Sequence, residues 1–586
     1  MSKKRTISLV LLLLLTVAVI LPSMTVSAAN LKYKTSWLGN TYGSLDEKWV
    51  QNQSFAMYTS PDGTCYVNST WDEGGRECGI YKDGDVLGKI EVGHGGGGWA
   101  ITGDGSYIYA AHGNWVERYD AKTGKEVKAS WSGAGKTGKN VVTGLAIYNG
   151  EIYISDDKTK KVYVYSTSTF KELRSWSLDR PRNIAVDKGG NLWIIQGATK
   201  VNSEDLKYPP AILKYKPDGT PLPEKITNVV NPTALAVDSK GRLLVAENGP
   251  DQQIRIYDIS SKPTTVSTFG VKGGIYSGVK GEVGDLKLYG IRAITVDSKD
   301  NIYVANNGFN WGGSDLRKFT PSGKMVWQLL GLTFVDIADA DPTTDCVDVY
   351  TKDEHFTLDL TKNTPGGEWK FKGYLHDPFT FLEDYRWDNT MENAMVRTIS
   401  GKRFLFTTNM YSNFLMVYRF DSKNYGELAI PSAMLVPEWG FTKPNGRPSK
   451  GHWIWRDKNG DGKYQSNEYE AGKIESRHAS TYYPDEKGGI WKAMDDAANA
   501  IRYYPCSGLD KVGNPIYNYS DSKTFPIPEP FTRICRLNYQ PDTDAMYITG
   551  FTKERPGKDG ESGGAGSEVA CYEKWLSGKP TLKYRV

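Results

Sequence analysis

Short segments in which apolar residues alternate with polar ones run along most of the chain, separated by turns rich in Gly, Asp, Asn and Pro. Convincing helical periodicity is hard to find. Many short strands joined by such turns are typical of an all-β sandwich, barrel or propeller. A chain of 586 residues exceeds one ordinary domain. The pattern therefore indicates either a repeated architecture or two domains.

The strand pattern repeats. Three segments share a small-apolar strand, a polar turn and a second strand: Pro181–Asp187 leading to Asn191–Ile194, Pro232–Asp238 leading to Arg242–Val245, and Ile291–Asp297 leading to Asn301–Val304. A third strand follows at Gln253–Tyr257 and again at Asp315–Phe319. Strand, turn, strand, turn, strand is the order found in one propeller blade.

These motifs resemble NHL-repeat propellers, whose repeats contain a Pro, an Ala-Val-Asp strand, a Gly-Asn turn, a Tyr-Val strand and an Arg-Ile strand. The resemblance implies an all-β propeller of four-stranded antiparallel blades. Weaker matches bring the number of units to ten: Pro61–Val67, Trp99–Tyr109, Gly144–Ile154, Ala340–Val349, Val396–Thr407, Tyr482–Trp491 and Leu537–Ile548.

Ten units exceed the usual 4–8 blades of a propeller. Either some weak units are insertions or there are two sub-domains. We expect one propeller of about six to eight blades, with NHL-like blades over 29–375 and divergent blades over 376–586 that carry an inserted loop.

The first 28 residues predict a secretory signal peptide. Lys3, Lys4 and Arg5 precede an apolar run from Ile7 to Leu21, and Val26–Ala28 supplies the small-residue cleavage pattern. The alternative is an uncleaved anchor, but the apolar run is short for a span of about 20 residues. We therefore expect a secreted, extracellular protein with no membrane-inserted segment in the mature chain.

Charge argues against a nucleic-acid partner. Without the three basic residues of the leader, the chain has 69 Lys and Arg against 68 Asp and Glu. Proteins that bind nucleic acid usually show a basic patch or stripe. A nearly neutral chain gives no sign of one.

Six cysteines in an exported protein permit disulfides. Cys65 and Cys78 flank the turn-like segment Trp71–Gly75, so a hairpin would place them opposite one another. The pairing of the other four cysteines stays open. No Cys/His spacing predicts a zinc site.

One motif predicts calcium. Residues 457–468 match the EF-hand loop at every required position. Calcium takes six to eight oxygen ligands, which we assign to Asp457, Asn459 and Asp461, the Lys463 carbonyl, Gln465 through a water, and Glu468. The alternative is a solvated hairpin loop. No helix pair flanks the segment, so we expect a structural clip and not a calcium sensor.

Blade alignment places cations and imidazoles together at the channel mouth. Arg182 and Arg292 occupy the same position in two blades, His478 approaches it in a later blade, and His94 precedes the Gly95–Gly98 run. Such groups suit a carboxylate ligand, since Arg binds carboxylate bidentately. We predict these four residues as catalytic. The alternative is that the arginines only bond neighbouring blades.

The resemblance adds a metal alternative. Some NHL propellers, notably the peptide-amidating lyases, hold zinc on channel histidines. Here His94, His112 and His478 would be the residues to converge. They lack a diagnostic spacing, so this remains an analogy of fold.

Aromatic residues outside the blade pattern are candidates for stacking on sugar rings. The irregular stretch His376–Trp387 contains Tyr385, Arg386 and Trp387. Trp311, on a Gly-rich turn, and Trp115 are similar candidates. We predict that these five residues bind substrate. The plain alternative for the stretch is a packed connection between blades.

Together these features favour a secreted enzyme that degrades an acidic extracellular polysaccharide by a lyase reaction. β-Elimination next to a uronate needs a cation for the carboxylate and a Tyr or His as base. One alternative is a non-catalytic propeller module that binds glycan or protein within a larger secreted protein. Another is a metal-dependent lyase or lactonase of the NHL-like type. The sequence does not indicate an oligomeric state.

Overall fold

The computed structural model describes residues 49–72, 75–93, 95–131, 142–197, 209–306, 313–331, 337–362, 367–387, 392–409, 412–436, 444, 446–449, 451–472, 479–494, 497–557 and 565–586. The predicted signal peptide lies outside them. Within them, no helix is long and apolar enough to cross a membrane.

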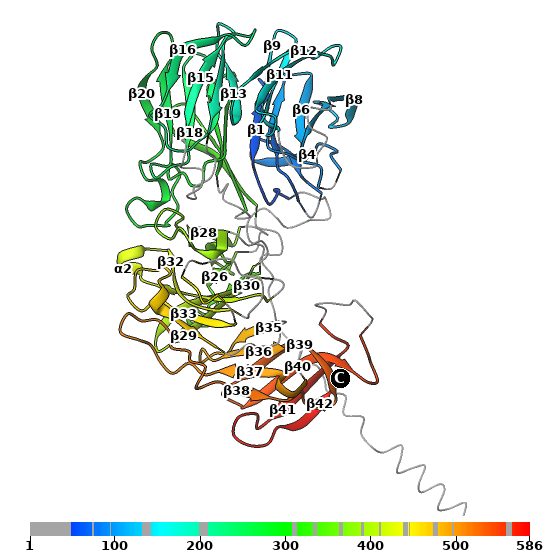
Figure 1. Cartoon of the computed structure of the whole chain (residues 1–586), viewed down its shortest axis with the longest axis vertical. Helices are drawn as coiled ribbons and strands as arrows, with labels where there is room; N and C mark the ends of the chain where they lie inside the picture. Colours follow the sequence, from blue (N-terminus) through cyan, green and yellow to red (C-terminus); the bar gives the residue numbers. More distant parts are fainter. Residues whose placement is uncertain are drawn as a thin grey trace, which may run out of the picture. The chain divides into compact units, whose positions relative to one another are not determined.

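The described chain is an all-β propeller protein built from ten antiparallel sheets, nine with four strands and one with six (Figure 1). The first six sheets are made by β1 Ala56–Thr59, β2 Cys65–Asn68, β3 Cys78–Lys82, β4 Asp85–Lys89; β5 Ile101–Gly103, β6 Tyr107–His112, β7 Trp115–Asp120, β8 Glu126–Trp131; β9 Val142–Tyr148, β10 Glu151–Asp156, β11 Lys161–Ser166, β12 Glu172–Ser177; β13 Pro181–Val186, β14 Leu192–Gln196, β15 Ala211–Tyr215, β16 Pro221–Ile226; β17 Pro232–Val237, β18 Leu243–Glu247, β19 Gln253–Asp258, β20 Thr264–Phe269; β21 Ala293–Val296, β22 Ile302–Asn306, β23 Ser314–Phe319 and β24 Met325–Gly331.

Four further sheets follow. Their strands are β25 Asp339–Ala340, β26 Asp348–Tyr350, β27 Glu354–Leu358, β28 Trp369–Tyr374; β29 Glu392–Ile399, β30 Lys402–Asn409, β31 Leu415–Phe420, β32 Ala429–Val436, β33 Trp453–Arg456, β34 Tyr469–Ala471; β35 Ala479–Pro484, β36 Ile490–Met494, β37 Ile501–Tyr504, β38 Lys523–Phe525; β39 Phe531–Gln540, β40 Ala545–Thr552, β41 Glu568–Glu573 and β42 Thr581–Arg585. The short helices described are α2 Ser422–Tyr425 and the 3-10 turns Gly274–Tyr276, Pro342–Thr344, Tyr385–Trp387, Ser466–Glu468 and Ala497–Asn499.

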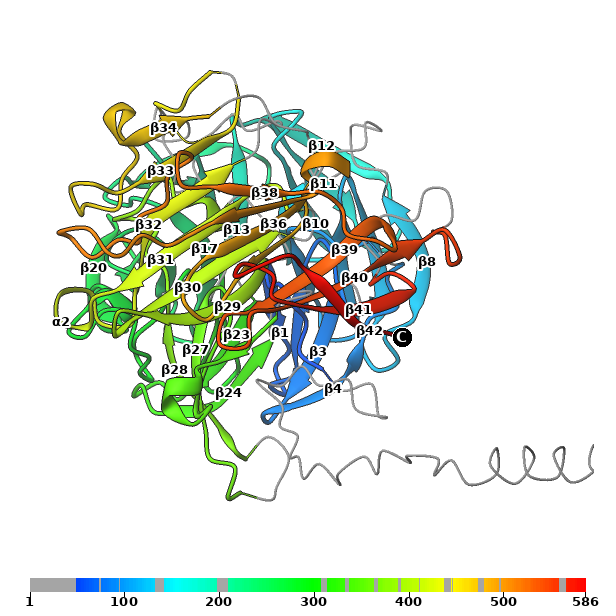
Figure 2. The ribbon, with the colours of Figure 1, turned by 90° about the horizontal axis from the view of Figure 1, so that it is seen from below.

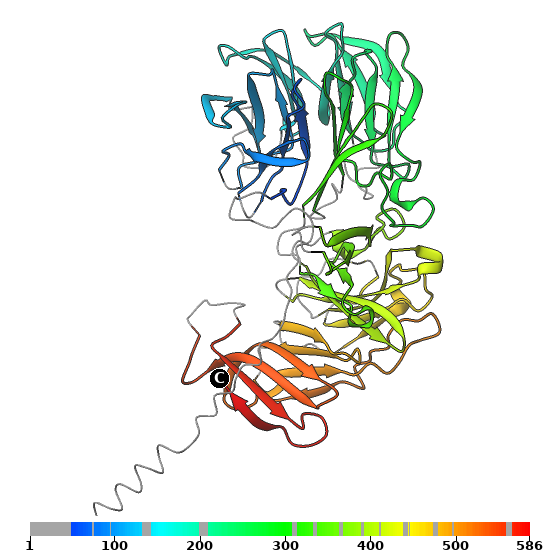
Figure 3. The same cartoon turned by 180° about the vertical axis from the view of Figure 1, so that it is seen from behind.

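The first six sheets close into a ring through their first strands. β1 packs against β5, β5 against β9, β9 against β13, β13 against β17, β17 against β21, and β21 against β1 again. Sheets of this kind around one axis are the blades of a propeller. We number these blades 1 to 6 in chain order. Within each blade the strands lie side by side in sequence order (Figure 3).

The later sheets pack one on the next. β29 contacts β25 and β26, and β39 contacts β35 and β36. A shared apolar core joins the six-stranded sheet β29–β34, seen in yellow in Figure 2, to the sheet β35–β38. The ring of six sheets thus ends with β24.

The sequence repeats coincide with these sheets. Each of the ten predicted units falls in a different sheet, and the all-β propeller fold is confirmed. Ala185, Ala236 and Thr295 lie on the first strands of blades 4, 5 and 6, opposite Trp193, Leu244 and Tyr303 on the second strands. The inner-strand alignment is therefore correct.

The Asp that ends the repeated Ala-Val-Asp motif has a local cause. Its side chain accepts the backbone N–H four residues later, which closes the turn between the first two strands. The bonds run to Asp187 from Asn191 (2.8 Å), to Asp238 from Arg242 (2.8 Å), to Asp297 from Asn301 (3.0 Å) and to Asp485 from Gly489 (2.8 Å). The last case shows that a divergent sheet keeps the same turn.

The expected Cys65–Cys78 disulfide is wrong. In the β2–β3 hairpin Cys65 lies opposite Tyr81, and Cys78 lies opposite Asn68. The hairpin is centred on the segment Trp71–Gly75, but Cys65 lies six positions before this segment and Cys78 only three after it. The two thiols are therefore three residues out of register and pack in different apolar cores.

We expect reducing agents to leave the thermal stability of blade 1 unchanged, because no bond joins these two buried thiols. One check compares the melting temperature with and without a reductant. A second unfolds the protein without reductant, labels its thiols and measures by mass whether Cys65 and Cys78 have both reacted. A fall of several degrees on reduction, lost in Cys65→Ser, would contradict it.

Candidate functional site at the mouth of the six-bladed ring

Six residues at the start of the inner strands share one register position, one from each blade. The backbone N–H of Phe55 bonds the Asn68 carbonyl, and that of Arg292 makes the equivalent bond to Ala305. We call the set the mouth ring: Phe55, Trp99, Thr143, Arg182, Thr233 and Arg292. It contains no acidic residue.

Arg292 lies against two aromatic rings of the mouth ring. Its guanidinium carbon is 5.1 Å from the ring centroid of Phe55 and 4.8 Å from that of Trp99. The two rings stack on each other, with centroids 4.4 Å apart and an interplanar angle of 15°. A cation over an aromatic face is attracted by the ring quadrupole. Side chains from blades 6, 1 and 2 therefore meet at one point.

The Arg292 guanidinium is a positive charge without an acidic partner among the described residues. Burial, and after it the charge of Arg182, lower the pKa of Arg292 to about 10. In the described part of the chain no carboxylate pairs with this guanidinium, and the indole Nε1 of Trp99 is closed off from solvent without an acceptor. Buried donors normally have partners. Among the described residues, the Trp99 indole N–H has no acceptor and the Arg292 guanidinium has no acidic partner.

Arg182 is held differently. Its Nη2 lies 3.2 Å from Oδ2 of Asp157, and its Nε donates to the Gly197 carbonyl at 3.3 Å. The structure thus brings the two predicted arginines near each other. Of these two, Arg182 has an acidic partner among the described residues and Arg292 has none.

Two threonines fix the strands that carry the arginines. The Thr143 hydroxyl donates to the carbonyl of Pro181 (2.6 Å), the residue before Arg182. The Thr233 hydroxyl donates to the carbonyl of Ile291 (2.8 Å), the residue before Arg292. Each bond joins one blade to the next at the mouth ring.

The glycine run before Trp99 serves close packing. A Cβ on Gly97 would lie 1.6 Å from the Ser69 carbonyl oxygen, and one on Gly98 would lie 2.3 Å from that of Ala111. Only residues without a side chain fit there. The run therefore lets this segment pack directly against the backbone of Ser69 and Ala111.

Several predicted site residues lie outside the described residues: His94, Trp311 and His478, together with the Trp387 side chain. Trp115 is described and is 40% exposed. Its indole stacks on His112, with ring centroids 5.9 Å apart, and donates to Glu117 at 2.9 Å. It is an accessible aromatic face on blade 2.

His112 has no place in a metal site among the described residues. Its Nε2 is 2.7 Å from the Tyr119 hydroxyl, and burial lowers its pKa. Across the described chain, no group of three or more His, Cys, Asp or Glu side chains is gathered so that it could hold a metal ion.

Arg386 has a structural role in place of the expected contact with substrate. The residue is fully buried, and its guanidinium donates to Asp384 (2.6 and 3.0 Å) and to the carbonyls of Lys352 (3.1 Å) and Ala429 (3.1 Å). Each of its three guanidinium nitrogens donates to a protein group. Its neighbour Tyr385 packs edge-on against Phe414, with centroids 4.8 Å apart. The stretch is a packed connection.

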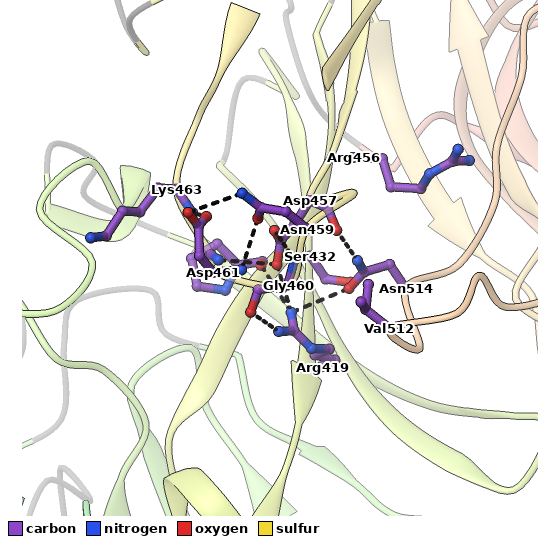
Figure 4. Close-up of polar contacts among 12 residues, drawn as sticks. Arg419, Ser432, Arg456, Asp457, Asn459, Gly460, Asp461, Lys463, Val512 and Asn514 are labelled. Atoms are coloured by element: carbon purple, nitrogen blue, oxygen red, sulfur yellow. Dashed lines mark hydrogen bonds and ion pairs between the residues drawn. The ribbon is translucent and has the colours of Figure 1, made fainter. Parts of the chain in front are cut away.

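The loop 457–468 connects β33 to β34 (Figure 4). Oδ1 of Asp457 accepts from the Gly460 N–H (2.9 Å), and Oδ2 accepts from the Gly462 N–H (3.0 Å). Both glycines have positive φ, at 87° and 68°. The two glycines of the motif thus fold the loop around its first carboxylate.

The other predicted ligands lie around the same loop. Oδ1 of Asn459 accepts from the Asp461 N–H (3.0 Å), and Oδ2 of Asp461 accepts from the side-chain amides of Asn459 (3.1 Å) and Gln465 (2.8 Å). Oδ1 of Asp461 accepts from the Lys463 N–H (2.8 Å), which fixes the Lys463 peptide. The buried Glu468 accepts from the Trp455 indole at 3.0 Å.

One atom of the loop tests the fit to calcium. Oε1 of Gln465 is closed off from solvent and has no donor. A carbonyl oxygen without a donor suits a hard cation. Oδ1 of Asp457 and Oδ1 of Asp461 each accept a single N–H bond and keep a second lone pair. The donor set is all oxygen, as calcium requires, although the carboxylates are not gathered into a closed shell.

Sequence reasoning missed Phe55, Trp99 and Arg419. The first two occupy the position of Arg182 in the weakly matching units 1 and 2. Aligning the inner strands of those two units with the strong repeats, position by position, would have found them. Arg419 lies on β31 and forms an ion pair with Asp457 of the loop 457–468. No sequence pattern predicts this contact, because the two residues are far apart along the chain.

Comparison with known proteins supports no assignment to a family. No family model matches the chain, and no curated protein does. Similar solved structures include a quinonprotein alcohol dehydrogenase-like protein of Bacteroides thetaiotaomicron (17% identity over 46% of this chain and 64% of that one, TM-score 0.30). Others are a Bacteroides caccae protein of unknown function (13%, 48% and 92%, 0.31) and a candidate gluconolactonase (13%, 46% and 84%, 0.29).

The chain spans less than two thirds of the first of these structures. The low identities and TM-scores carry no information about activity. Function has to be argued from the site.

Proposed function

We propose that this chain is a secreted propeller that binds an acidic extracellular glycan at its mouth ring. The supporting observation is the Arg292 guanidinium, which lies over Phe55 and Trp99 and lacks a carboxylate partner in the described residues. A uronate carboxylate would accept two N–H bonds from it. The Trp99 indole N–H is a further donor beside it. Secretion rests on residues 1–28.

Cleavage by β-elimination is the catalytic form of this proposal. A base would remove the proton from the carbon that bears the carboxylate, and the bond from the next ring carbon to the glycosidic oxygen would break. A double bond would form between those two carbons, and the released oxygen would take a proton. Arg292 would neutralise the carboxylate while charge develops on it. The expected bases, His94 and His478, lie outside the described residues.

The decisive experiment incubates the purified protein with a panel of anionic and neutral polysaccharides. Absorbance of an unsaturated product and the formation of reducing ends report cleavage, and calorimetric titration reports binding. Binding of uronates with neither signal would leave a non-catalytic binding module. Equal binding of neutral and acidic glycans would overturn the proposal.

Replacing Trp99 with phenylalanine should weaken binding of a uronate oligosaccharide. The substitution keeps an aromatic face under Arg292 but removes the indole donor, and a lost hydrogen bond of about 0.5–1.5 kcal/mol corresponds to roughly a 2- to 13-fold loss of affinity. Trp115→Phe, in the same blade, is the matched control. A larger loss for the control would move the site to the Trp115 face.

We also propose that calcium binds the loop 457–468. Asp457, Asn459, Asp461 and Glu468 would supply side-chain oxygens, Lys463 its carbonyl, and Gln465 an oxygen directly or through a water. The unpartnered Oε1 of Gln465 supports this assignment. Calcium would supply positive charge to a loop that carries three carboxylates in its sequence, and so fix its conformation.

Calcium should therefore raise the melting temperature, because a ligand that binds only the native state stabilises it. The check is a melting curve in chelator and in millimolar calcium, with Asp461→Asn as the variant that removes one ligand charge. Equal curves for the wild-type chain in both buffers would contradict the assignment.

A further inference from the structure

Arg419 of β31 reaches the calcium-type loop from the neighbouring part of the sheet (Figure 4). Its Nη1 is 2.9 Å from Oδ2 of Asp457, and its Nη2 donates to the Gly460 carbonyl at 2.8 Å. Asp457 is fully buried. A guanidinium thus already sits on the first carboxylate of the loop.

The same arginine ties the loop to the next sheet. Its Nη1 also donates to Oδ1 of Asn514 at 3.2 Å, and that oxygen accepts from the Ser432 hydroxyl at 2.7 Å. The Asn514 amide in turn donates to the Asp457 carbonyl. Asn514 belongs to the connection between β37 and β38. Three chain segments therefore meet at Arg419.

The two oxygens of Asp457 are left in different states. Oδ2 accepts from Gly462 and from Arg419, whereas Oδ1 accepts, among the described residues, from Gly460 alone. The free lone pair for a cation is therefore on Oδ1. A calcium ion there and the guanidinium would share one carboxylate, and like charges this close repel strongly in a buried setting.

We propose that Arg419 sets this loop to weak calcium binding and holds the loop in place when calcium is absent. This inference rests on the proposed calcium site. Its consequence is a dissociation constant in the ~10⁻⁴–10⁻³ M range that suits extracellular modules. Arg419 is a positioning and affinity-setting residue, since it touches the ligand Asp457 and not the ion.

The test is calcium titration of the full chain with Arg419 replaced. Arg419→Gln removes the positive charge and keeps an amide donor for Asp457. We expect calcium to bind at least about tenfold more tightly in calorimetry, with a lower melting temperature in chelator and a larger rise on adding calcium. A residue with only a structural role would lower stability without raising affinity.

Arg419→Lys is the matched control, because it keeps the charge but loses the second donor direction. Its calcium affinity should stay within about threefold of the wild-type value while its melting temperature in chelator falls. Calcium binding that is equal or weaker in Arg419→Gln would overturn the role of Arg419 and leave the calcium site standing. Absence of calcium binding in the wild type, Arg419→Gln and Arg419→Lys alike would overturn the site itself.

Discussion

Replacing Arg292 with alanine is expected to weaken binding of a uronate oligosaccharide by roughly 10- to 150-fold while changing stability little. Hydrogen bonds to a charged group contribute about 1.5–3 kcal/mol, which corresponds to that range of affinity. Stability should be nearly unaffected, since no carboxylate in the described residues loses a partner. The substitution also removes a positive charge close to Arg182. What it loses is the cation–π contact with Phe55 and Trp99.

Two further variants separate charge from geometry. Arg292→Lys keeps the charge without the bidentate fork, so its affinity should fall between those of the wild type and Arg292→Ala. Arg182→Ala removes an arginine from the same register position that is already paired with Asp157, and should cost less affinity and more stability. Titration calorimetry at two salt concentrations and melting curves measure both. An equal affinity loss for Arg182→Ala and Arg292→Ala would show general charge attraction in place of a specific contact.

The fold could be predicted because it repeats. The Asp that closes the first turn of a blade recurs at 187, 238 and 297, and the same bond pattern recurs at Asp485 in a divergent sheet. Because each of these hydrogen bonds joins residues four positions apart, the repeated residue types in the sequence predict them. How many blades close on each other depends on the contact of β21 with β1, between residues over two hundred positions apart, and no local pattern records it.

The site could be predicted only in part, for the same reason. Alignment placed Arg182 and Arg292 at one register position, and both lie in the mouth ring. It could not show that Arg182 forms an ion pair with Asp157. Nor could it show that Arg292 lies over the rings of Phe55 and Trp99. For Cys65 and Cys78 the predicted pairing was wrong, because the position of a turn in the sequence does not fix the register of the two strands that it joins.

Arg386 provides the second large expected effect, and it concerns stability. Replacing it with methionine should lower the free energy of unfolding by about 3–5 kcal/mol, the usual cost of breaking a buried ion pair from one side. The Asp384 carboxylate would remain buried with the Tyr418 hydroxyl at 2.9 Å as its main remaining side-chain donor. The carbonyls of Lys352 and Ala429 would lose a donor at the same time.

The double variant Asp384→Asn with Arg386→Met shows whether the loss of stability comes from the Asp384 carboxylate, which is left buried without its arginine partner in Arg386→Met. Removing the carboxylate as well should recover part of the loss, because breaking one partner of a buried pair costs more than replacing both. Denaturant unfolding of the wild type, both single variants and the double variant gives the coupling energy directly. In each variant, the affinity for a uronate oligosaccharide, measured where the protein is folded, should equal that of the wild type. If Arg386→Met kept its stability and lost binding, Arg386 would contact the ligand, as its place in an aromatic stretch first indicated.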